Sequence, residues 1–290
     1  MTRYSQNCRG FTLVELLVVI TIIGVLASLA AGGAWYAWRM VTESMTKAQL
    51  SQMDLALDAY KGEFNEYPPM LSDATAVMRH VNSRWKRASL SYADILMAAG
   101  LPLDDASDDA DEKALKTSQR IAASLPFWLG GLYDPVKESY VGFSANLENP
   151  LGVERDGQGN ITFNYGGQRT ETRFDFSEKH LLPITGTTAR SFAIYDKPVV
   201  YFRSLITGEY DPIGCNMREC GIAVPYAKSA TAWHGAKKYQ LIHPGRDGIF
   251  GEGRTAPIAN TGDESTLTYE DYDNIVNFTD TATLKGALNQ

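Results

Sequence analysis

An uncharged apolar run near the N-terminus constrains this chain more than any other feature. From Leu16 to Trp38 there are 23 consecutive residues without a charged side chain. A helix rises about 1.5 Å per residue and the hydrocarbon core of a bilayer is about 30 Å thick, so the run is long enough to span it. No other stretch of the 290 residues is comparable. The sequence therefore predicts a single membrane-spanning helix.

A carboxylate near the start of the apolar segment sets it apart from an ordinary secretory signal peptide. Residues 1–10 include Arg3 and Arg9 and no acid, but Glu15 lies in the first turns of the apolar segment that begins at Phe11. A charge inside lipid costs about 2.5–3.5 kcal/mol on insertion scales, so a lone acid needs a partner. Cleavage of the Gly10–Phe11 bond would create a free amino terminus close to Glu15. The sequence thus favours processing at this bond.

The segment around this bond resembles the class III signal of type IV pilins and type II secretion pseudopilins. It reads Arg9-Gly10-Phe11-Thr12-Leu13-Val14-Glu15-Leu16. The resemblance implies that a prepilin peptidase cuts after Gly10 on the cytoplasmic side and methylates Phe11. It also implies that Glu15 is the glutamate used in assembly. It covers residues 1 to about 35, and an ordinary signal anchor is the alternative.

The helix is expected to continue beyond the membrane. The first proline of the chain is Pro68. Because proline lacks the N–H donor and its ring clashes with the preceding turn, Tyr67-Pro68-Pro69 should end the helix. The sequence predicts one helix from Phe11 to Phe64, whose second half packs on a globular domain, in keeping with the lollipop architecture of the family. Its apolar face follows a 3-4-3-4 spacing: Leu50, Met53, Leu57, Tyr60 and Phe64.

The middle of the chain reads as two helical stretches around an acidic segment. Residues 76–101 and 112–125 are rich in helix formers, and six acids with no base lie between positions 104 and 112. This acidic run is predicted to be a solvated, mobile loop, with a hard-cation site as the alternative. Because major pseudopilins are roughly half as long, residues 72–190 are interpreted as an inserted region. The six acids are Asp104, Asp105, Asp108, Asp109, Asp111 and Glu112.

From about Leu132 onward the residue pattern favours β-strands. Five short runs are strand candidates: residues 140–143, 161–165, 192–195, 199–202 and 239–242. We expect an α+β fold, in which a long N-terminal helix, half transmembrane, packs on a small antiparallel sheet with a largely helical insertion. The expected organisation is a leader (1–10), a transmembrane and polymerisation helix (11–38), the second half of the long helix (39–70), the inserted region (72–190), helical then β, and the β-sheet with a C-terminal Gly/Asp loop (191–290).

Two cysteines remain after the predicted cleavage, which removes Cys8 with the leader. Cys215 and Cys220 would close a loop of six residues. An even cysteine count in a domain outside the cytoplasm favours a disulfide between them. Two free thiols, or half of a metal site, are the alternatives.

A glycine-rich loop follows the last predicted strand. Four glycines lie between positions 245 and 253, and Asp247 lies among them. Such a loop exposes carbonyl oxygens, and two or three carboxylates would complete the six to eight oxygens that Ca²⁺ prefers. Neither the EF-hand spacing nor a dinucleotide fingerprint is present. A turn without metal is the alternative to a calcium loop.

The same loop resembles the C-terminal calcium loop of the major type II pseudopilins. Under this resemblance Asp247 is the first aspartate ligand and Asp273 the later one, with Asp271 as its near alternative. An insertion from Arg254 to Glu270 departs from the family pattern. It contains the further acids Asp263 and Glu264.

Charge and motif content exclude several other classes of function. The net charge of −7 argues against a nucleic-acid binder that uses a basic face. There is no H-E-x-x-H, G-x-S-x-G or P-loop motif, so an enzyme is not expected. The four histidines are interpreted as surface or packed residues: His80, His180, His234 and His243.

Two functions remain. The first is a structural subunit of a pilus-like filament, most simply a type II secretion pseudopilus. The second is a filament-displayed binding or adhesion subunit whose inserted region recognises a ligand. The resemblance implies a prepilin peptidase, other pilin or pseudopilin subunits and an inner-membrane assembly platform as partners. It also implies a bacterial inner-membrane protein with a cytoplasmic N-terminus and a periplasmic globular domain.

Overall fold

The computed structural model describes residues 12–158, 160–211, 213–229, 232–251 and 268–288. The chain forms two compact units, Met1–Ser44 and Met45–Gln290. Helix α1 (Leu13–Phe64) contributes to both. The long helix predicted from the sequence is therefore confirmed over the described residues.

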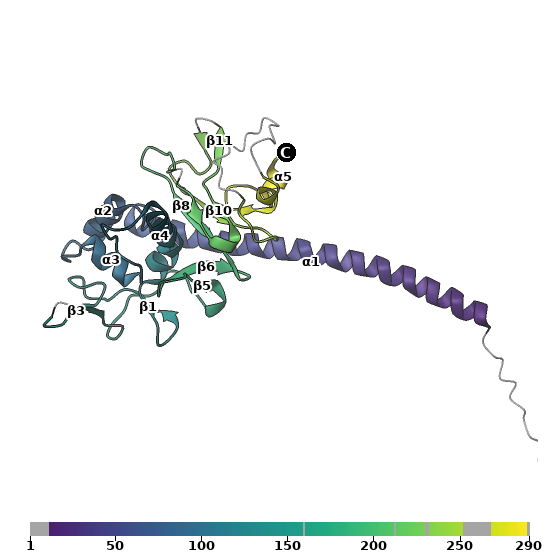
Figure 1. The fold of residues 1–290 in the computed structure, drawn as a ribbon, viewed down its shortest axis with the longest axis horizontal. Helices are drawn as coiled ribbons and strands as arrows, with labels where there is room; N and C mark the ends of the chain where they lie inside the picture. Colours follow the sequence, from purple (N-terminus) through teal and green to yellow (C-terminus); the bar gives the residue numbers. More distant parts are fainter. Residues whose placement is uncertain (1–11, 159, 212, 230–231, 252–267, 289–290) are drawn as a thin grey trace, which may run out of the picture. The chain divides into compact units, whose positions relative to one another are not determined.

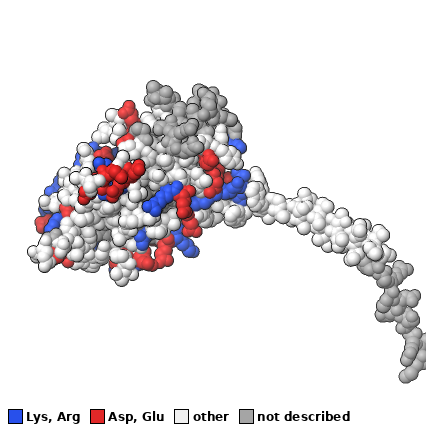
Figure 2. Space-filling view, in the orientation of Figure 1, with Lys and Arg blue, Asp and Glu red and all other residues white. Residues whose placement is uncertain are grey.

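The described part of the first unit is helical and uncharged over most of its length. Its apolar side chains are exposed along the whole segment, and the span is long and apolar enough to cross a membrane by length and composition. In Figure 2 the protruding part of this helix is white, without the blue or red of charged residues. The first pair of opposite charges after Glu15 is Arg39 with Glu43, whose Nε and Oε1 lie 2.9 Å apart.

The second unit is built around the other half of α1. Leu50, Met53, Leu57 and Tyr60 are fully buried, as the 3-4-3-4 spacing predicts. The helix ends at Phe64, where Asn65 takes a left-handed conformation with φ of 62° and its N–H still bonds to the Lys61 carbonyl. The chain therefore turns away three residues before the first proline.

The helix-rich stretch 76–101 forms two helices, α2 (Ala74–Arg84) and α3 (Tyr92–Ala98). The stretch is divided because Ser91 starts a new helix. Its hydroxyl accepts the Asp94 N–H while the Asp94 carboxylate accepts the Ser91 N–H, which is a capping box. Trp85 ends α2, and its ring lies against Phe143 in the core.

Helix α4 (Ala110–Gly130) is longer than the predicted stretch of 112–125. It begins at Asp109, whose carboxylate accepts the Glu112 N–H at 2.8 Å. It continues through Pro126 because the residues that follow are apolar and fully packed. Among them, Trp128 donates its indole N–H to the Pro69 carbonyl at 2.8 Å. Tertiary packing thus outweighs the local cost of proline.

The strands form small antiparallel sheets, which confirms the predicted α+β class. The sheet nearest the C-terminus has the order β14-β13-β8, and Gln240 of β13 lies opposite Phe202 of β8. A second three-stranded sheet has the order β5-β6-β7, and the described residues also form four two-stranded sheets. The strands are β1 (Tyr133–Asp134), β2 (Ser139–Tyr140), β3 (Val153–Arg155), β4 (Ile161–Phe163), β5 (Leu181–Pro183), β6 (Arg190–Ile194), β7 (Lys197–Pro198), β8 (Val200–Arg203), β9 (Cys215–Asn216), β10 (Ile222–Ala223), β11 (Ala227–Ser229), β12 (Ala232–Trp233), β13 (Tyr239–His243) and β14 (Ile275–Val276).

Within the described residues, four short helical elements connect or follow these strands. They are η1 (Glu178–His180), η2 (Arg218–Cys220), η4 (Tyr269–Asp273) and α5 (Leu284–Leu288). Figure 1 shows α2, α3 and α4 together within this unit, beside the sheet that contains β8. Helix α4 packs against β6, β8 and β9. The predicted inserted region and the C-terminal sheet therefore share one hydrophobic core.

Two histidines are packed inside this core. Both ring nitrogens of His80 form hydrogen bonds. Nε2 lies 2.6 Å from the Tyr60 hydroxyl, and Nδ1 lies 2.6 Å from Glu66 Oε1. His243 lies at the end of β13, with Nε2 3.2 Å from the Ile194 carbonyl. Its Nδ1 has no partner among the described residues. Burial lowers the pKa of His243 to about 4.

The buried His243 should make this unit sensitive to mild acid. Between about pH 6.5 and about pH 4, the unfolded chain binds a proton at this residue and the folded chain does not, so stability falls as pH falls. The free energy of unfolding should fall by about 3 kcal/mol across this pH interval. His243→Gln keeps an N–H donor and should reduce the slope of unfolding free energy against pH, measured by urea denaturation. His180→Gln, on η1, is the matched control and should leave the slope unchanged.

Candidate functional site

The start of α1 holds the charge that the sequence assigns to assembly. Thr12 and Glu15 form a reciprocal cap: Glu15 Oε2 accepts the Thr12 N–H at 2.9 Å and the Thr12 hydroxyl at 2.8 Å, and Thr12 Oγ1 accepts the Glu15 N–H at 3.2 Å. The carboxylate is therefore fixed at the first helical turn. Gly10 and Phe11, the predicted processing residues, lie outside the described residues.

A second candidate site is the turn that follows β13. Gly248 donates its N–H to the Pro244 carbonyl at 3.1 Å, which closes the turn. Gly245 has φ of 59°, and a Cβ at this position would lie 2.2 Å from the Asp273 carbonyl oxygen. Glycine is therefore required at position 245, because the turn packs directly on the backbone of Asp273.

Two of the three predicted calcium ligands meet at this turn. Asp273 Oδ2 accepts the N–H groups of Arg246 at 2.7 Å and Asp247 at 3.1 Å, and Asp247 Oδ1 accepts the Ile249 N–H at 2.8 Å. Asp273 Oδ1 is buried without a hydrogen-bond partner among the described residues. Burial, with repulsion from Asp273 and Glu270, raises the pKa of Asp247.

The third predicted ligand, Asp271, has other partners. Its Oδ1 accepts the Tyr226 hydroxyl at 2.8 Å, and its Oδ2 accepts the N–H and the hydroxyl of Thr268, each at 2.9 Å. Burial raises its pKa, and these hydrogen bonds oppose that effect. Asp271 thus caps η4 and fastens it to the core.

These residues do not by themselves fit a calcium site. Ca²⁺ takes six to eight oxygen ligands, whereas the part of the chain that the structure describes contains no group of three His, Cys, Asp or Glu side chains placed to hold a metal. Two carbonyls of the turn, those of Gly245 and Arg246, accept hydrogen bonds from the ammonium group of Lys197. Asp263 and Glu264 lie outside the described residues. Calcium binding stays a prediction from the sequence.

The predicted disulfide between Cys215 and Cys220 is not formed, and both cysteines are free. In the β9–β10 hairpin Cys215 pairs with Ala223, and its buried thiol donates to the Ser118 carbonyl at 3.4 Å. Cys220 lies in the connecting helix η2, near the charge of Lys197. The two thiols therefore have different surroundings. Burial raises the pKa of Cys215 to about 12, so this thiol stays protonated and unreactive.

Two basic side chains of α4 bind the acidic run 104–112. Five of its six acids are exposed, in keeping with the predicted solvated run, and Asp108 is buried. Lys116 Nζ lies 2.6 Å from Asp108 Oδ2 and 2.9 Å from the Leu103 carbonyl. Arg120 forms a two-pronged pair with Asp104, at 2.7 and 3.1 Å. The hydrogen bonds from the Asp105 N–H and from Lys116 hold the pKa of Asp108 below its usual range.

Sequence analysis missed three residues with structural roles. Lys197 was not singled out, because its contacts lie 48 and 49 positions away in the chain. Lys47 and Asp54 of α1 bind residues more than 180 positions distant. A local pattern contains no signal for such pairs. For Lys47 and Asp54, the one sequence signal of such contacts was a polar side chain beside the apolar stripe of α1.

Comparison with known proteins gives one family model, which matches the N-terminal part of the chain, and several curated relatives. Residues 5–31 match the family model of the prokaryotic N-terminal methylation motif. The chain is 38% identical over 66 residues to the type II secretion system core protein G of Escherichia coli, which is 23% of this chain and 46% of that protein. It is 40% identical over 60 residues to the protein of the same name from Pectobacterium carotovorum, covering 21% of this chain and 38% of the relative.

The corresponding protein of Klebsiella pneumoniae is 40% identical over 63 residues, which is 22% of this chain and 45% of the relative. The chain thus spans less than half the length of these curated relatives. No solved structure gives a significant match.

The ion pair between α4 and the acidic run should hold that run in place. Lys116→Met removes the cation and leaves the Asp108 carboxylate buried without its partner, so the Tm should fall by several degrees and the amides of residues 103–109 should exchange faster. Hydrogen exchange followed by mass spectrometry measures both the place and the size of the effect. Lys113→Met, on an exposed position of the same helix, is the matched control. Unchanged exchange in Lys116→Met would contradict the structural role of the pair.

Proposed function

The chain belongs, through its N-terminal segment, to the type IV pilin and pseudopilin family, and from this premise we propose that it is a structural subunit of a type II secretion pseudopilus. It has no enzymatic role in this proposal. A prepilin peptidase removes residues 1–10 and methylates Phe11. The subunit then enters a filament through its N-terminal helix.

The observation that carries this proposal is an acid fixed at the start of an otherwise uncharged apolar helix. Glu15 is held by Thr12 in the first turn of α1, and the next charged residue along the helix is Arg39. A bilayer disfavours such an acid. The arrangement becomes favourable when an amino terminus with the opposite charge lies next to it.

Assembly follows from pairing these charges between subunits. In the filament the helices leave the bilayer and pack together, and Glu15 of one subunit neutralises the terminal amine of Phe11 on its neighbour. Both ions then lie in a medium of low dielectric constant, where an unpaired charge is strongly destabilising. The pair therefore selects one register between adjacent helices.

The proposed location and partners follow from this assembly. Before assembly the subunit is anchored in the bacterial inner membrane by α1, with its N-terminus in the cytoplasm and residues 45–290 in the periplasm. Other pseudopilin subunits are its partners in the filament. An inner-membrane platform with its ATPase supplies the work of extraction.

A second candidate function, a filament-displayed binding subunit, is favoured by one cavity. It has a volume of about 390 Å³ and lies between α4, β5 and η2. This size is typical of small-molecule sites. Gln119 lines it with its Oε1 buried and without a hydrogen-bond partner among the described residues. Deletion of the gene separates the two functions, since a structural pseudopilin is required for protein secretion and a displayed binding subunit is not.

Processing at the Gly10–Phe11 bond should be visible in the mass of the native protein. The expected product begins with N-methyl-Phe11 and has a net charge of −9, because the leader takes the two positive charges of Arg3 and Arg9 from a total of −7. Mass spectrometry of protein isolated from its own membranes makes the measurement. An intact Met1 terminus, or cleavage beyond residue 28, would rule out the proposed processing.

Replacement of the helix-start acid should block assembly and leave the rest of the protein intact. Glu15→Ala should insert in the membrane and keep the Tm of the wild type, but its incorporation into filaments should be abolished because the terminal amine has no partner. Sheared-filament fractions probed with antibody measure incorporation. Glu43→Ala is the control, since it removes an acid that pairs with Arg39 one turn away. Normal assembly of Glu15→Ala would refute charge pairing.

A further inference from the structure

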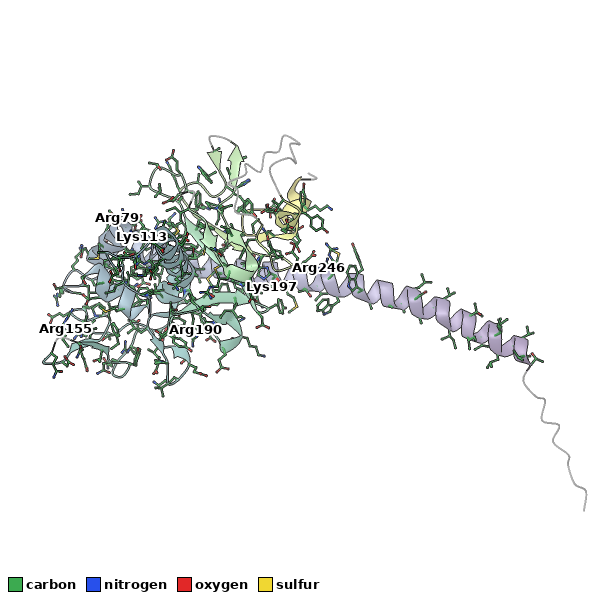
Figure 3. The ribbon with its side chains drawn as sticks, in the orientation of Figure 1. Arg79, Lys113, Arg155, Arg190, Lys197 and Arg246 are labelled. Carbon is green, nitrogen blue, oxygen red and sulfur yellow. The ribbon has the colours of Figure 1, made fainter. Side chains whose placement is uncertain are left out.

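The turn after β13 has a cation supplied by the chain itself. Lys197 Nζ donates a hydrogen bond to the Gly245 carbonyl at 2.9 Å and another to the Arg246 carbonyl. Figure 3 shows Lys197 and Arg246 next to each other. The two carbonyls belong to consecutive residues, so one ammonium group binds two successive peptide groups of the turn.

Two carboxylates near the turn attract the same ammonium group. Asp273 and Asp247 are the two acids whose attraction acts most strongly on Lys197. Asp273 also binds the turn from the other direction, through the N–H groups of Arg246 and Asp247. Carbonyl oxygens and carboxylates around one cation are the ligand types that a calcium ion uses. Here a lysine provides the positive charge.

The position of Lys197 is fixed by its own local structure. It opens β7, where it pairs with Ile194 of β6 across a two-residue turn. Tyr195 and Asp196 form that turn with φ of 51° and 60°, both in the left-handed region that a type I′ hairpin requires. The aliphatic stem of Lys197 lies against Gly248, where a Cβ would be 3.5 Å from Lys197 Cε. The side chain is thus directed at the turn by a rigid hairpin.

We propose that the Lys197 ammonium group is the resident cation of the turn formed by residues 244–248, and that this turn folds without calcium. In this chain the lysine takes the role that the glycine-rich loop and its aspartates suggested for Ca²⁺. Asp247 and Asp273 attract the lysine ammonium group. Asp271 instead accepts a hydrogen bond from the hydroxyl of the buried Tyr226. The proposal does not depend on the function in secretion, because it concerns the cation that stabilises one loop.

The test compares the effect of calcium on the wild type and on Lys197→Met, using the full chain in detergent. The wild type should give the same Tm in excess EGTA and in excess CaCl₂. Lys197→Met keeps the length of the stem and removes the ammonium group, so in EGTA its Tm should fall by about 4–8 °C. Lys179→Met, an exposed lysine on η1, is the matched control and should melt like the wild type.

Two results would overturn the proposal. One is a lower Tm of the wild type in EGTA than in CaCl₂, which would show that calcium and not lysine holds the loop. The other is a Lys197→Met protein that melts at the wild-type temperature in EGTA. The first measurement uses the unaltered protein, so the proposal stays open to refutation even where the variant fails to fold.

Discussion

The unit Met45–Gln290 depends on the buried face of α1. Leu50, Met53 and Leu57 have no exposed surface, and each such side chain contributes about 1.5–3 kcal/mol when it leaves water. Polar side chains of α1 beside this buried face bind the C-terminal elements that pack on it. Lys47 donates to the carbonyls of Val276 and Thr279, and Asp54 accepts hydrogen bonds from Tyr239 and Asn277. The C-terminal segment is thereby closed onto a helix that lies more than 180 positions earlier in the chain.

Local sequence patterns were sufficient for one helix face and three strands. The 3-4-3-4 stripe predicted the buried side of α1, and short runs rich in β-branched and aromatic residues predicted the positions of β6, β8 and β13. The start of α3 was missed although its signal is local. Ser91 followed by Asp94 is a capping box, and it lay unnoticed inside a run of helix formers. The end of α4 was missed for a different reason, since tertiary packing carries the helix through Pro126.

The candidate sites show why chemistry is harder to predict than fold. Six acids in nine residues suggested a solvated run, and five of them are exposed. The acidic pattern contained no sign that Lys116 and Arg120, one and two helical turns further along the chain, would bind Asp108 and Asp104. The disulfide prediction rested on the number of cysteines. That number contains no information about the hairpin register, in which Cys215 pairs with Ala223. Lys197 depends on a hairpin and a turn that are separate in sequence. Each outcome was decided by a contact that only the folded chain creates.

Helix α1 carries two different residue patterns, and each pattern suits a different solvent. From Leu16 to Trp38 it is apolar on every side, which suits a lipid environment. From Leu50 onward the apolar residues narrow to one stripe, and the other sides carry charges, which suits the surface of a globular unit. The change of pattern begins at Arg39 and Glu43. The charged half is unsuited to lipid, because burying a charge there is costly. The uncharged half is unsuited to water, because it would expose a large apolar surface. The charge pattern alone therefore fixes how far along the helix a membrane or a filament core can reach.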